Sequence, residues 1–327
     1  MSKKLARCTK FIFLVSLVLS HFVGNKNEGF ADTAASSTFI YPYDNYNKGK
    51  MDPQLTGWPL TEEEKTYIAI PNYKRRPGAE VKKFNPSMMP VTPSADSFGG
   101  PTAYMDAHAK ILDRVSKYKA DKGNDVDILL MGDSITAQWC NMAAYNAYPQ
   151  PFNTAWTKAF PNYTALNTGI GGDKSQGLLW RLDHGGNILG ELKPKLIIMA
   201  IGHNNMFFTP DTGIPAAAEG IKYCVLNVRH KYPEAEVLVV KILPNKDPSA
   251  KFYVDAKAIN ATLDGFKLDS DPKVHIMPDM WADWTTADGK LIDGLLRDGV
   301  HPSQDKGYAL YAEKLKPIVD KILAMKK

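Results

Sequence analysis

Ser134 and the residues around it have the composition of a nucleophilic centre. Ser134 lies in the stretch Gly-Asp-Ser-Ile-Thr at 132–136, directly after the apolar run 127–131. A serine where a strand gives way to a helix has its hydroxyl at the rim of the sheet and its N–H among the unpaired donors of a helix N-terminus. That position suits a reaction that creates an oxyanion. The segment alone is equally consistent with an ordinary helix N-cap serine.

Asp298 and His301, near the end of the chain, have the spacing of an acid–base pair. In a tight turn, three residues bring the carboxylate to the imidazole Nδ1, which fixes the tautomer and leaves Nε2 free to take a proton from a serine. A histidine alone before a helix would be expected on the surface. The aspartate three residues earlier, together with a candidate serine elsewhere, favours a catalytic role.

Two other polar stretches follow predicted strands. Residues 167–173 read Asn-Thr-Gly-Ile-Gly-Gly-Asp, and residues 202–205 read Gly-His-Asn-Asn. Glycines let backbone N–H groups approach a ligand closely, and the amide of Asn204 can donate into a cleft. By itself Asn204 fits a turn residue better. A dinucleotide loop would need glycine at Lys174, and the sequence has no H-E-x-x-H or C-x-x-C pattern, so we expect no cofactor or metal. The G-x-S-x-G elbow of α/β-hydrolases is also absent, which argues against that fold.

The elements that must position these residues alternate along the chain. Short apolar runs predict buried strands at 127–131, 164–167, 196–201, 237–242 and 274–277. Helical patterns fall at 104–119, 135–147, 175–184, 216–231 and 256–268, and a final helix is expected to be capped by Ser303. Strands separated by helices imply parallel pairing, hence a three-layer α/β/α domain with its active site beyond the carboxyl ends of the strands.

Taken together, the four polar blocks resemble the SGNH hydrolase superfamily, also called GDSL esterases. The blocks occur in order: the Ser134 block, the glycine-rich block ending at Asp173, the block at 202–205 and the pair Asp298 and His301. The resemblance covers about residues 126–327. Residues 166–173, 179–182 and 192–195 look most like the catalytic subunits of platelet-activating-factor acetylhydrolase. This resemblance implies a flavodoxin-like parallel sheet of five strands with an N-terminal extension.

The resemblance also implies roles for single residues. Ser134 would be the nucleophile, His301 the general base and then acid, and Asp298 the carboxylate that orients it. Three donors would form the oxyanion hole: the N–H groups of Ser134 and Gly172 and the side-chain amide of Asn204. We expect three neighbours of these residues to line the substrate site: Asp133, His203 and Asn205. His203 departs from the small residue usual there, which bears on acyl-group or leaving-group preference.

The N-terminal third has a different composition. Basic residues followed by the apolar run 11–23 and by Gly29-Phe30-Ala31 describe a secretory signal peptide cleaved after Ala31, so we expect a secreted or periplasmic protein without stable membrane insertion. Residues 32–103, rich in Pro, Tyr, Asn and Lys, predict an extended arm, and 104–327 the hydrolase domain. Five Lys/Arg and one Glu lie in 1–31, so the formal net charge falls from +5 to +1 without them, which argues against a nucleic-acid partner.

The expected reaction is hydrolysis of short-chain esters, with acetyl groups on carbohydrate favoured because exported relatives of this superfamily often act on acetylated sugars. Two alternatives stay open: a lipid-directed acylhydrolase, and a non-catalytic carbohydrate-binding protein on the same scaffold. The substrate would be a small molecule or a polysaccharide. Cys140 and Cys224, which remain after removal of the signal, are interpreted as buried thiols, although an exported chain could pair them.

Overall fold

The protein was analysed as a computed structural model, which describes residues 100–326 except for 142–143, 145, 184–190, 209–212 and 246–250. The expected signal segment and nearly all of the expected arm lie outside the described residues. The arm was predicted to end at residue 103, with a helix from Tyr104. The first described helix already begins at Gly100.

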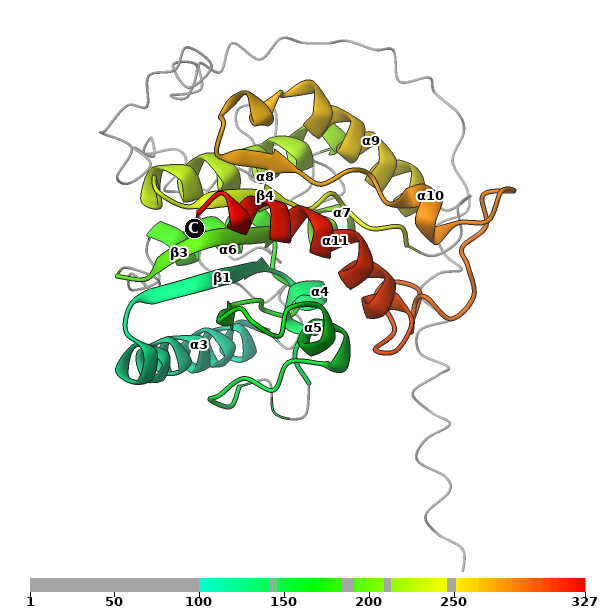
Figure 1. Cartoon of the computed structure of the whole chain (residues 1–327). Helices are drawn as coiled ribbons and strands as arrows, with labels where there is room; N and C mark the ends of the chain where they lie inside the picture. Colours follow the sequence, from blue (N-terminus) through cyan, green and yellow to red (C-terminus); the bar gives the residue numbers. More distant parts are fainter. Residues whose placement is uncertain are drawn as a thin grey trace, which may run out of the picture. The chain divides into compact units, whose positions relative to one another are not determined.

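Five parallel strands form a single sheet (Figure 1). They are β1 (Asp125–Gly132), β2 (Ala165–Asn167), β3 (Lys193–Ala200), β4 (Glu236–Val239) and β5 (Val274–Ile276), in the order β2-β1-β3-β4-β5. In register, Leu130 of β1 lies opposite Asn167 of β2 and Ile198 of β3. This is the strand order of flavodoxin-like folds, in which ligands bind where the order reverses beside β1. The predicted fold class is confirmed.

Helices follow most strands. They are α3 (Gly100–Lys122), α4 (Ser134–Ala137), α5 (Thr154–Ala159), α6 (Ser175–Asp183), α7 (His203–Phe208), α8 (Gly213–Lys231), α9 (Lys251–Gly265), α10 (Trp281–Trp284) and α11 (Gly307–Ala324), with a 3₁₀ turn at Leu268–Ser270. The crossovers between parallel strands place these helices on the two faces of the sheet (Figure 1).

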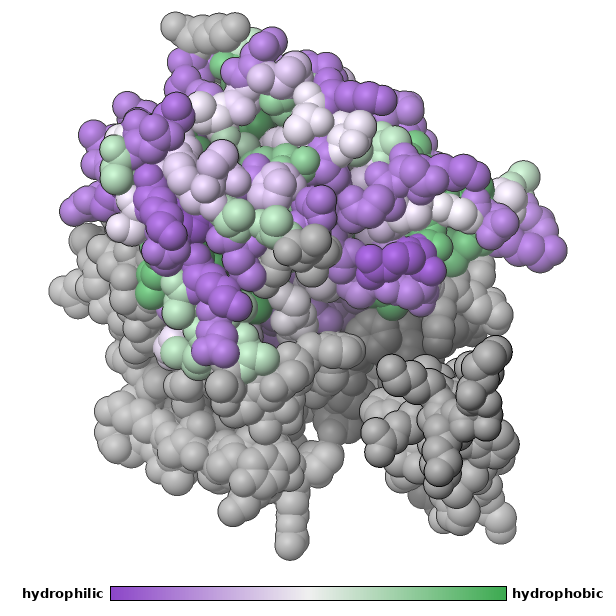
Figure 2. Space-filling model, turned by 90° about the horizontal axis from the view of Figure 1, so that it is seen from below, coloured by the Kyte–Doolittle hydropathy of each residue, from purple (hydrophilic) through white to green (hydrophobic). Residues whose placement is uncertain are grey.

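Successive side chains of a strand point to opposite faces of the sheet, so the core has two layers, one on each face. Leu129 and Met131 of β1 pack with side chains of α3, α6, α8 and α9, whereas Ile128 and Leu130 pack with side chains of α4, α5 and α11. Both faces of the strands are therefore covered, which explains why they read as continuous apolar runs in the sequence. On the face shown in Figure 2, hydrophilic residues dominate the coloured surface and apolar residues form only small scattered patches.

One predicted helix was wrong in length. The pattern at 135–147 predicted one continuous helix, but α4 ends at Ala137. The Thr136 carbonyl accepts from the Trp139 N–H at 3.1 Å, a bond between residues three apart that tightens the last turn, and it also accepts from the Asn167 side chain at 2.7 Å. The chain then turns, and the short helix α5, missed by the pattern, begins after Asn153, whose side chain accepts a hydrogen bond from the Trp156 N–H.

The last helix begins later than predicted. α11 starts at Gly307, with Lys306 at the N-cap, and not directly after Ser303. The Ser303 hydroxyl instead donates to the Gly294 carbonyl at 2.6 Å and accepts from the Gly307 N–H at 3.0 Å, so it ties the preceding loop to the helix.

Two further observations concern the class of protein. Cys140 and Cys224 are both free and buried, as interpreted from the sequence, although Cys140 follows α4 and is not helical. Among the described residues, no helix is long and apolar enough to cross a membrane.

Candidate active site

The polar blocks meet at the carboxyl ends of β1, β2 and β3. Gly132, Asn167 and Ala200 are the last residues of these strands, and Gly132 lies opposite Ala200 in the sheet register. Ser134, the loop 168–173 and the start of α7 follow directly. Because parallel strands all end at the same edge of the sheet, residues that are 70 positions apart in the sequence become neighbours there.

Ser134 is the first residue of α4 and is half-buried. The preceding Asp133 is the N-cap, and its Oδ1 accepts a hydrogen bond from the Ile135 N–H at 2.9 Å. This cap satisfies one of the free N–H groups of the first turn and fixes the direction in which the helix leaves the strand. Ser134 is thereby held at the junction with its hydroxyl at the rim.

The loop before α11 brings His301 to Ser134. His301 Nε2 lies 2.8 Å from Ser134 Oγ, although 167 residues separate the two in the sequence. On the other side of the ring, Nδ1 lies 3.0 Å from Oδ1 and 2.9 Å from Oδ2 of Asp298. A serine hydroxyl, an imidazole and a carboxylate thus form a continuous chain of hydrogen-bonding groups, the arrangement that activates a serine for attack.

Several donors keep Asp298 ionised. Its Oδ1 accepts hydrogen bonds from the His301 N–H at 2.9 Å and the Val300 N–H at 3.1 Å, and Arg297 pairs with Oδ2 at 2.9 Å. Partial burial alone would raise the pKa of Asp298, but these donors, the His301 N–H first, outweigh burial and hold the pKa well below its usual range. An ionised Asp298 accepts a hydrogen bond from Nδ1 of His301. It therefore favours the tautomer of His301 that carries its proton on Nδ1 and leaves Nε2 able to accept one.

Two further groups expected to bind an oxyanion lie in the segments that follow β2 and β3. Gly172 has a φ of 75°, a left-handed conformation that a glycine adopts without strain. Asn204, in the first turn of α7, is 8% exposed, and its Nδ2 donates to the Asp173 carbonyl at 2.8 Å. Its other contact, to Oδ2 of Asp133, is 3.4 Å long and weak. One N–H of the Asn204 amide is therefore firmly held, and the other is only loosely engaged.

The three residues expected to line the substrate site are all buried. Burial, with a further contribution from Asp173, raises the pKa of Asp133 to about 7. Burial first, and the charge of His301 second, lower the pKa of His203 to about 4, and Nε2 of His203 lies 3.2 Å from the Asn245 side chain. A direct substrate contact by these residues remains a prediction.

The third of them, Asn205, makes hydrogen bonds through both the oxygen and the nitrogen of its side-chain amide. Its Oδ1 accepts from the Ser175 N–H at 3.1 Å, and its Nδ2 donates to Ser175 Oγ and to Gln176 Oε1. The structure therefore places Asn205 between α7 and α6, behind the site.

Sequence reasoning gave no role to two residues that the structure places beside the site. Tyr104 and Arg181 both bond to the buried carboxylate of Asp173. Arg181 was part of the stretch that carried the family resemblance, and an arginine following the apolar run Leu178-Leu179-Trp180 was the one available signal. Among the described residues, no group of three or more His, Cys, Asp or Glu side chains could hold a metal ion.

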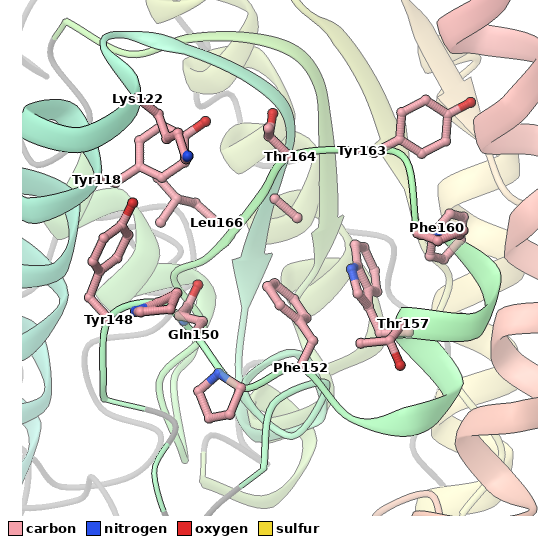
Figure 3. Close-up of a pocket in the computed structure, with 15 residues that line it drawn as sticks. Tyr118, Lys122, Tyr148, Gln150, Phe152, Thr157, Phe160, Tyr163, Thr164 and Leu166 are labelled. Atoms are coloured by element: carbon pink, nitrogen blue, oxygen red, sulfur yellow. The ribbon is translucent and has the colours of Figure 1, made fainter.

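A hollow whose lining does not include Ser134 lies along the outer edge of β2 (Figure 3). It has a volume of about 540 Å³ and is lined mainly by aromatic and proline side chains between α3 and α5. The side chain of Gln150 lies at one end and pairs with both backbone groups of Asn167, at 2.7 Å to the N–H and 3.1 Å to the carbonyl. We call this hollow the β2 groove.

Comparisons with known proteins show which family the chain is similar to. The model of the GDSL-like lipase/acylhydrolase family matches residues 130–310. The chain is 30% identical to platelet-activating factor acetylhydrolase IB subunit alpha1 of Pongo abelii over 169 residues, 52% of this chain and 69% of that protein. It is 31% identical to subunit alpha2 of Rattus norvegicus over 161 residues, 49% and 59% of the two chains. A solved GDSL-like lipase from Bacteroides thetaiotaomicron is 18% identical, with a TM-score of 0.46 over 64% of this chain and 98% of that one.

Proposed function

Because the chain belongs to the GDSL-like lipase/acylhydrolase family and is thus a carboxylic ester hydrolase, we propose that Ser134 is its nucleophile, with His301 as base and Asp298 as orienting carboxylate. The observation that carries this proposal is the 2.8 Å contact between His301 Nε2 and Ser134 Oγ. That is the distance over which a proton passes from a hydroxyl to a base.

The reaction then runs in two halves. Ser134 Oγ attacks the ester carbonyl while His301 Nε2 takes its proton, and the tetrahedral intermediate collapses as His301 returns the proton to the leaving alcohol. The acyl group stays on Ser134. Water then attacks the acyl-enzyme with His301 again as base, and the carboxylic acid and the free serine are released. General acid–base catalysis of this kind contributes about 10²–10⁴-fold.

The negative charge of the intermediate needs donors that are already in place. We assign this task to the N–H groups of Ser134 and Gly172 and to the loosely engaged N–H of Asn204. A single such donor is worth about 3–4 kcal/mol in the transition state. Asp133, beneath Ser134, would act by capping α4 and so fixing the direction of the Ser134 N–H.

For the substrate we propose short acyl groups, acetyl above all, on a carbohydrate. The relative matched over 69% of its length is named an acetylhydrolase, which supports a short acyl group. The same relative acts by its name on platelet-activating factor, so a lipid-directed acylhydrolase is the second candidate.

The experiment that separates these substrates is a series of nitrophenyl esters of increasing acyl length together with acetylated xylan. We expect kcat/KM to fall steeply beyond the shortest acyl chains and acetate to be released from xylan. Efficient turnover of long acyl esters would instead favour the lipid substrate. Absence of turnover on every ester would favour a binding protein on this scaffold. We also propose export with cleavage after Ala31, which N-terminal sequencing of the secreted protein tests.

Asn204→Ala tests the oxyanion assignment. If its amide binds the oxyanion, the variant should lose about 10²–10³-fold in kcat with little change in KM, because the charge exists only in the transition state. A turn residue would behave otherwise, with a lower Tm and unchanged turnover per folded molecule. Measuring kcat, KM and Tm on one preparation distinguishes the two roles.

A further inference from the structure

Asp173 connects the two halves of the proposed oxyanion hole. It follows Gly172 directly in the chain, so its position restrains the residue whose N–H is proposed to bind the oxyanion. Its own carbonyl accepts the hydrogen bond from Asn204 Nδ2 at 2.8 Å. A displacement of Asp173 would therefore move the Gly172 N–H and the Asn204 amide together.

The side chain of Asp173 is held from two other elements. Arg181 of α6 pairs with Oδ2 at 2.5 Å, and the hydroxyl of Tyr104 on α3 donates to Oδ1 at 3.0 Å. The side chains of Asp173 and Arg181 are 1% and 2% exposed, and Tyr104 is 3% exposed. Solvent does not screen these interactions, so each remains strong.

Arg181 also reaches the other parts of the site. It donates to the Thr168 carbonyl at 2.6 Å and to the Gly132 carbonyl at 3.4 Å. Thr168 opens the loop that Asp173 closes, and Gly132 is two residues before Ser134. A single guanidinium therefore bonds to both ends of the glycine-rich loop and makes a longer, weak contact with the end of β1, an arrangement that suits its planar set of five donors.

A glycine, Gly177, leaves room for the side chains of Asp173 and Tyr104. A Cβ on Gly177 would lie 2.1 Å from Asp173 Oδ1 and 2.9 Å from the Tyr104 hydroxyl oxygen, so any larger residue there would displace both. A buried ion pair is weak evidence for stability, because burying two charges costs about as much as their attraction returns. Stability therefore does not explain why these charged residues are buried. Their contacts with the loop 168–173 offer another explanation.

We propose that Tyr104, Asp173 and Arg181 form a positioning network that holds the Gly172 N–H and the Asn204 amide in the geometry of the transition state. The inference rests on the proposed function, because it assigns a task to residues behind the proposed oxyanion hole. None of the three touches the substrate. Each acts through the loop 168–173 or through Asn204.

The chain offers a matched pair of variants for the test. Tyr104→Phe removes one hydroxyl, the donor to Asp173, and leaves the ring in the core. Tyr118→Phe removes the hydroxyl of a second buried tyrosine of the same helix. That hydroxyl is part-buried and donates to the Asp125 carbonyl at 2.7 Å, at the opposite end of β1. We expect Tyr104→Phe to lower kcat about tenfold with KM within about twofold, because the hole acts on the transition state and not on the bound ester. Tyr118→Phe should leave both constants within about twofold of the parent.

A double variant shows whether the effect passes through the oxyanion hole. In the Asn204→Ala background, one of the three proposed donors, and one of the two that Asp173 restrains, is already lost, so Tyr104→Phe should cost clearly less than it does in the parent. A merely structural role would give the same fold-change in both backgrounds. Urea midpoints of all variants, measured in parallel, separate loss of folded protein from loss of turnover per folded molecule.

The outcomes distinguish this inference from the proposed function. If the parent protein hydrolyses no ester, the proposed function fails, and the inference fails with it. If the parent is active and Tyr104→Phe matches Tyr118→Phe in kcat, the positioning network is wrong and the proposed function stands. An equal fold-change in the two backgrounds would also overturn the network. A loss of kcat specific to Tyr104→Phe and smaller in the Asn204→Ala background supports it.

Discussion

The candidate active site and the β2 groove lie against adjoining parts of one sheet but differ in chemistry. The groove has a volume of about 540 Å³, and its tyrosine hydroxyls are engaged elsewhere: Tyr118 with the Asp125 carbonyl, Tyr148 with Asp121 and Tyr163 with Asp320. The candidate active site holds a serine and an imidazole in contact and an amide N–H that is only loosely engaged. We therefore expect the reaction at the polar groups around Ser134 and not in the groove, whose polar groups already have partners.

Strand order explains why the two regions differ. The active site lies beside β1, where the chain moves to β2 on one side and to β3 on the other, so loops diverge and leave their polar ends uncovered. β2 is an edge strand, and proteins usually cover such edges. Here Gln150 supplies one donor and one acceptor to Asn167, as a neighbouring strand would. The groove side of β2 is thus partly capped by a side chain.

The largest difference between the two regions should appear on removal of the nucleophile. Ser134→Ala should lower ester hydrolysis by at least about 10⁴-fold with folding intact, because no other group supplies the attacking oxygen. Thr157→Ala, a variant at the exposed wall of the groove, should leave kcat within about twofold. Labelling with a fluorophosphonate should place the adduct on Ser134. An adduct on Ser175 or Ser303 would overturn the assignment.

Asp298→Asn should have the next largest effect. The amide cannot replace the carboxylate at Nδ1 without favouring the wrong tautomer of His301, so kcat should fall about 10²–10⁴-fold while KM changes little. Asp288→Asn, in the exposed turn beside Lys290, is the matched control and should retain full turnover. Values of kcat and KM for the parent and both variants, measured on one short ester, test this prediction. If kcat survives in Asp298→Asn, another acceptor orients His301.

Acid should destabilise the active-site region through His203. Its pKa is about 4 in the folded protein and about 6.5 when unfolded, so the unfolded chain binds a proton first as pH falls. The stability that His203 contributes is present above about pH 6.5 and is lost as pH falls toward 4. Between pH 7 and 5 the loss should be about 2 kcal/mol. Urea unfolding at both pH values should show that loss in the parent and a clearly smaller one in His203→Gln. Equal losses in the two proteins would refute this account.

The smallest effect on turnover is expected in the groove. Gln150→Ala leaves the Asn167 N–H without its 2.7 Å acceptor, so the free energy of unfolding should fall by about 1–2 kcal/mol. Turnover per folded molecule should stay within about twofold, because Ser134 and His301 keep their contacts. Urea midpoints and kcat measured together test this. A large loss of kcat with an unchanged midpoint would mean that the groove takes part in the reaction.

The fold class, the strands and the four polar blocks could all be predicted from the sequence. Buried parallel strands are continuous apolar runs, so their existence is a local signal. The ends of such strands converge, so polar residues after them predict a common site. The contact between Asp298 and His301 follows from their spacing of three, and Ser134 from its place at the first strand end.

Only the tertiary structure decided how these parts are held. The last turn of α4, which ends at Ala137, accepts a hydrogen bond at the Thr136 carbonyl from the amide of Asn167, 31 residues away. The network around Asp173 joins Tyr104 to a residue 69 positions later and to Arg181. Helical period and turn spacing extend over a few residues and carry no information on such contacts. The path of the loops decides which buried polar groups come into contact. These contacts are also required because every polar group in the core needs a hydrogen-bond partner.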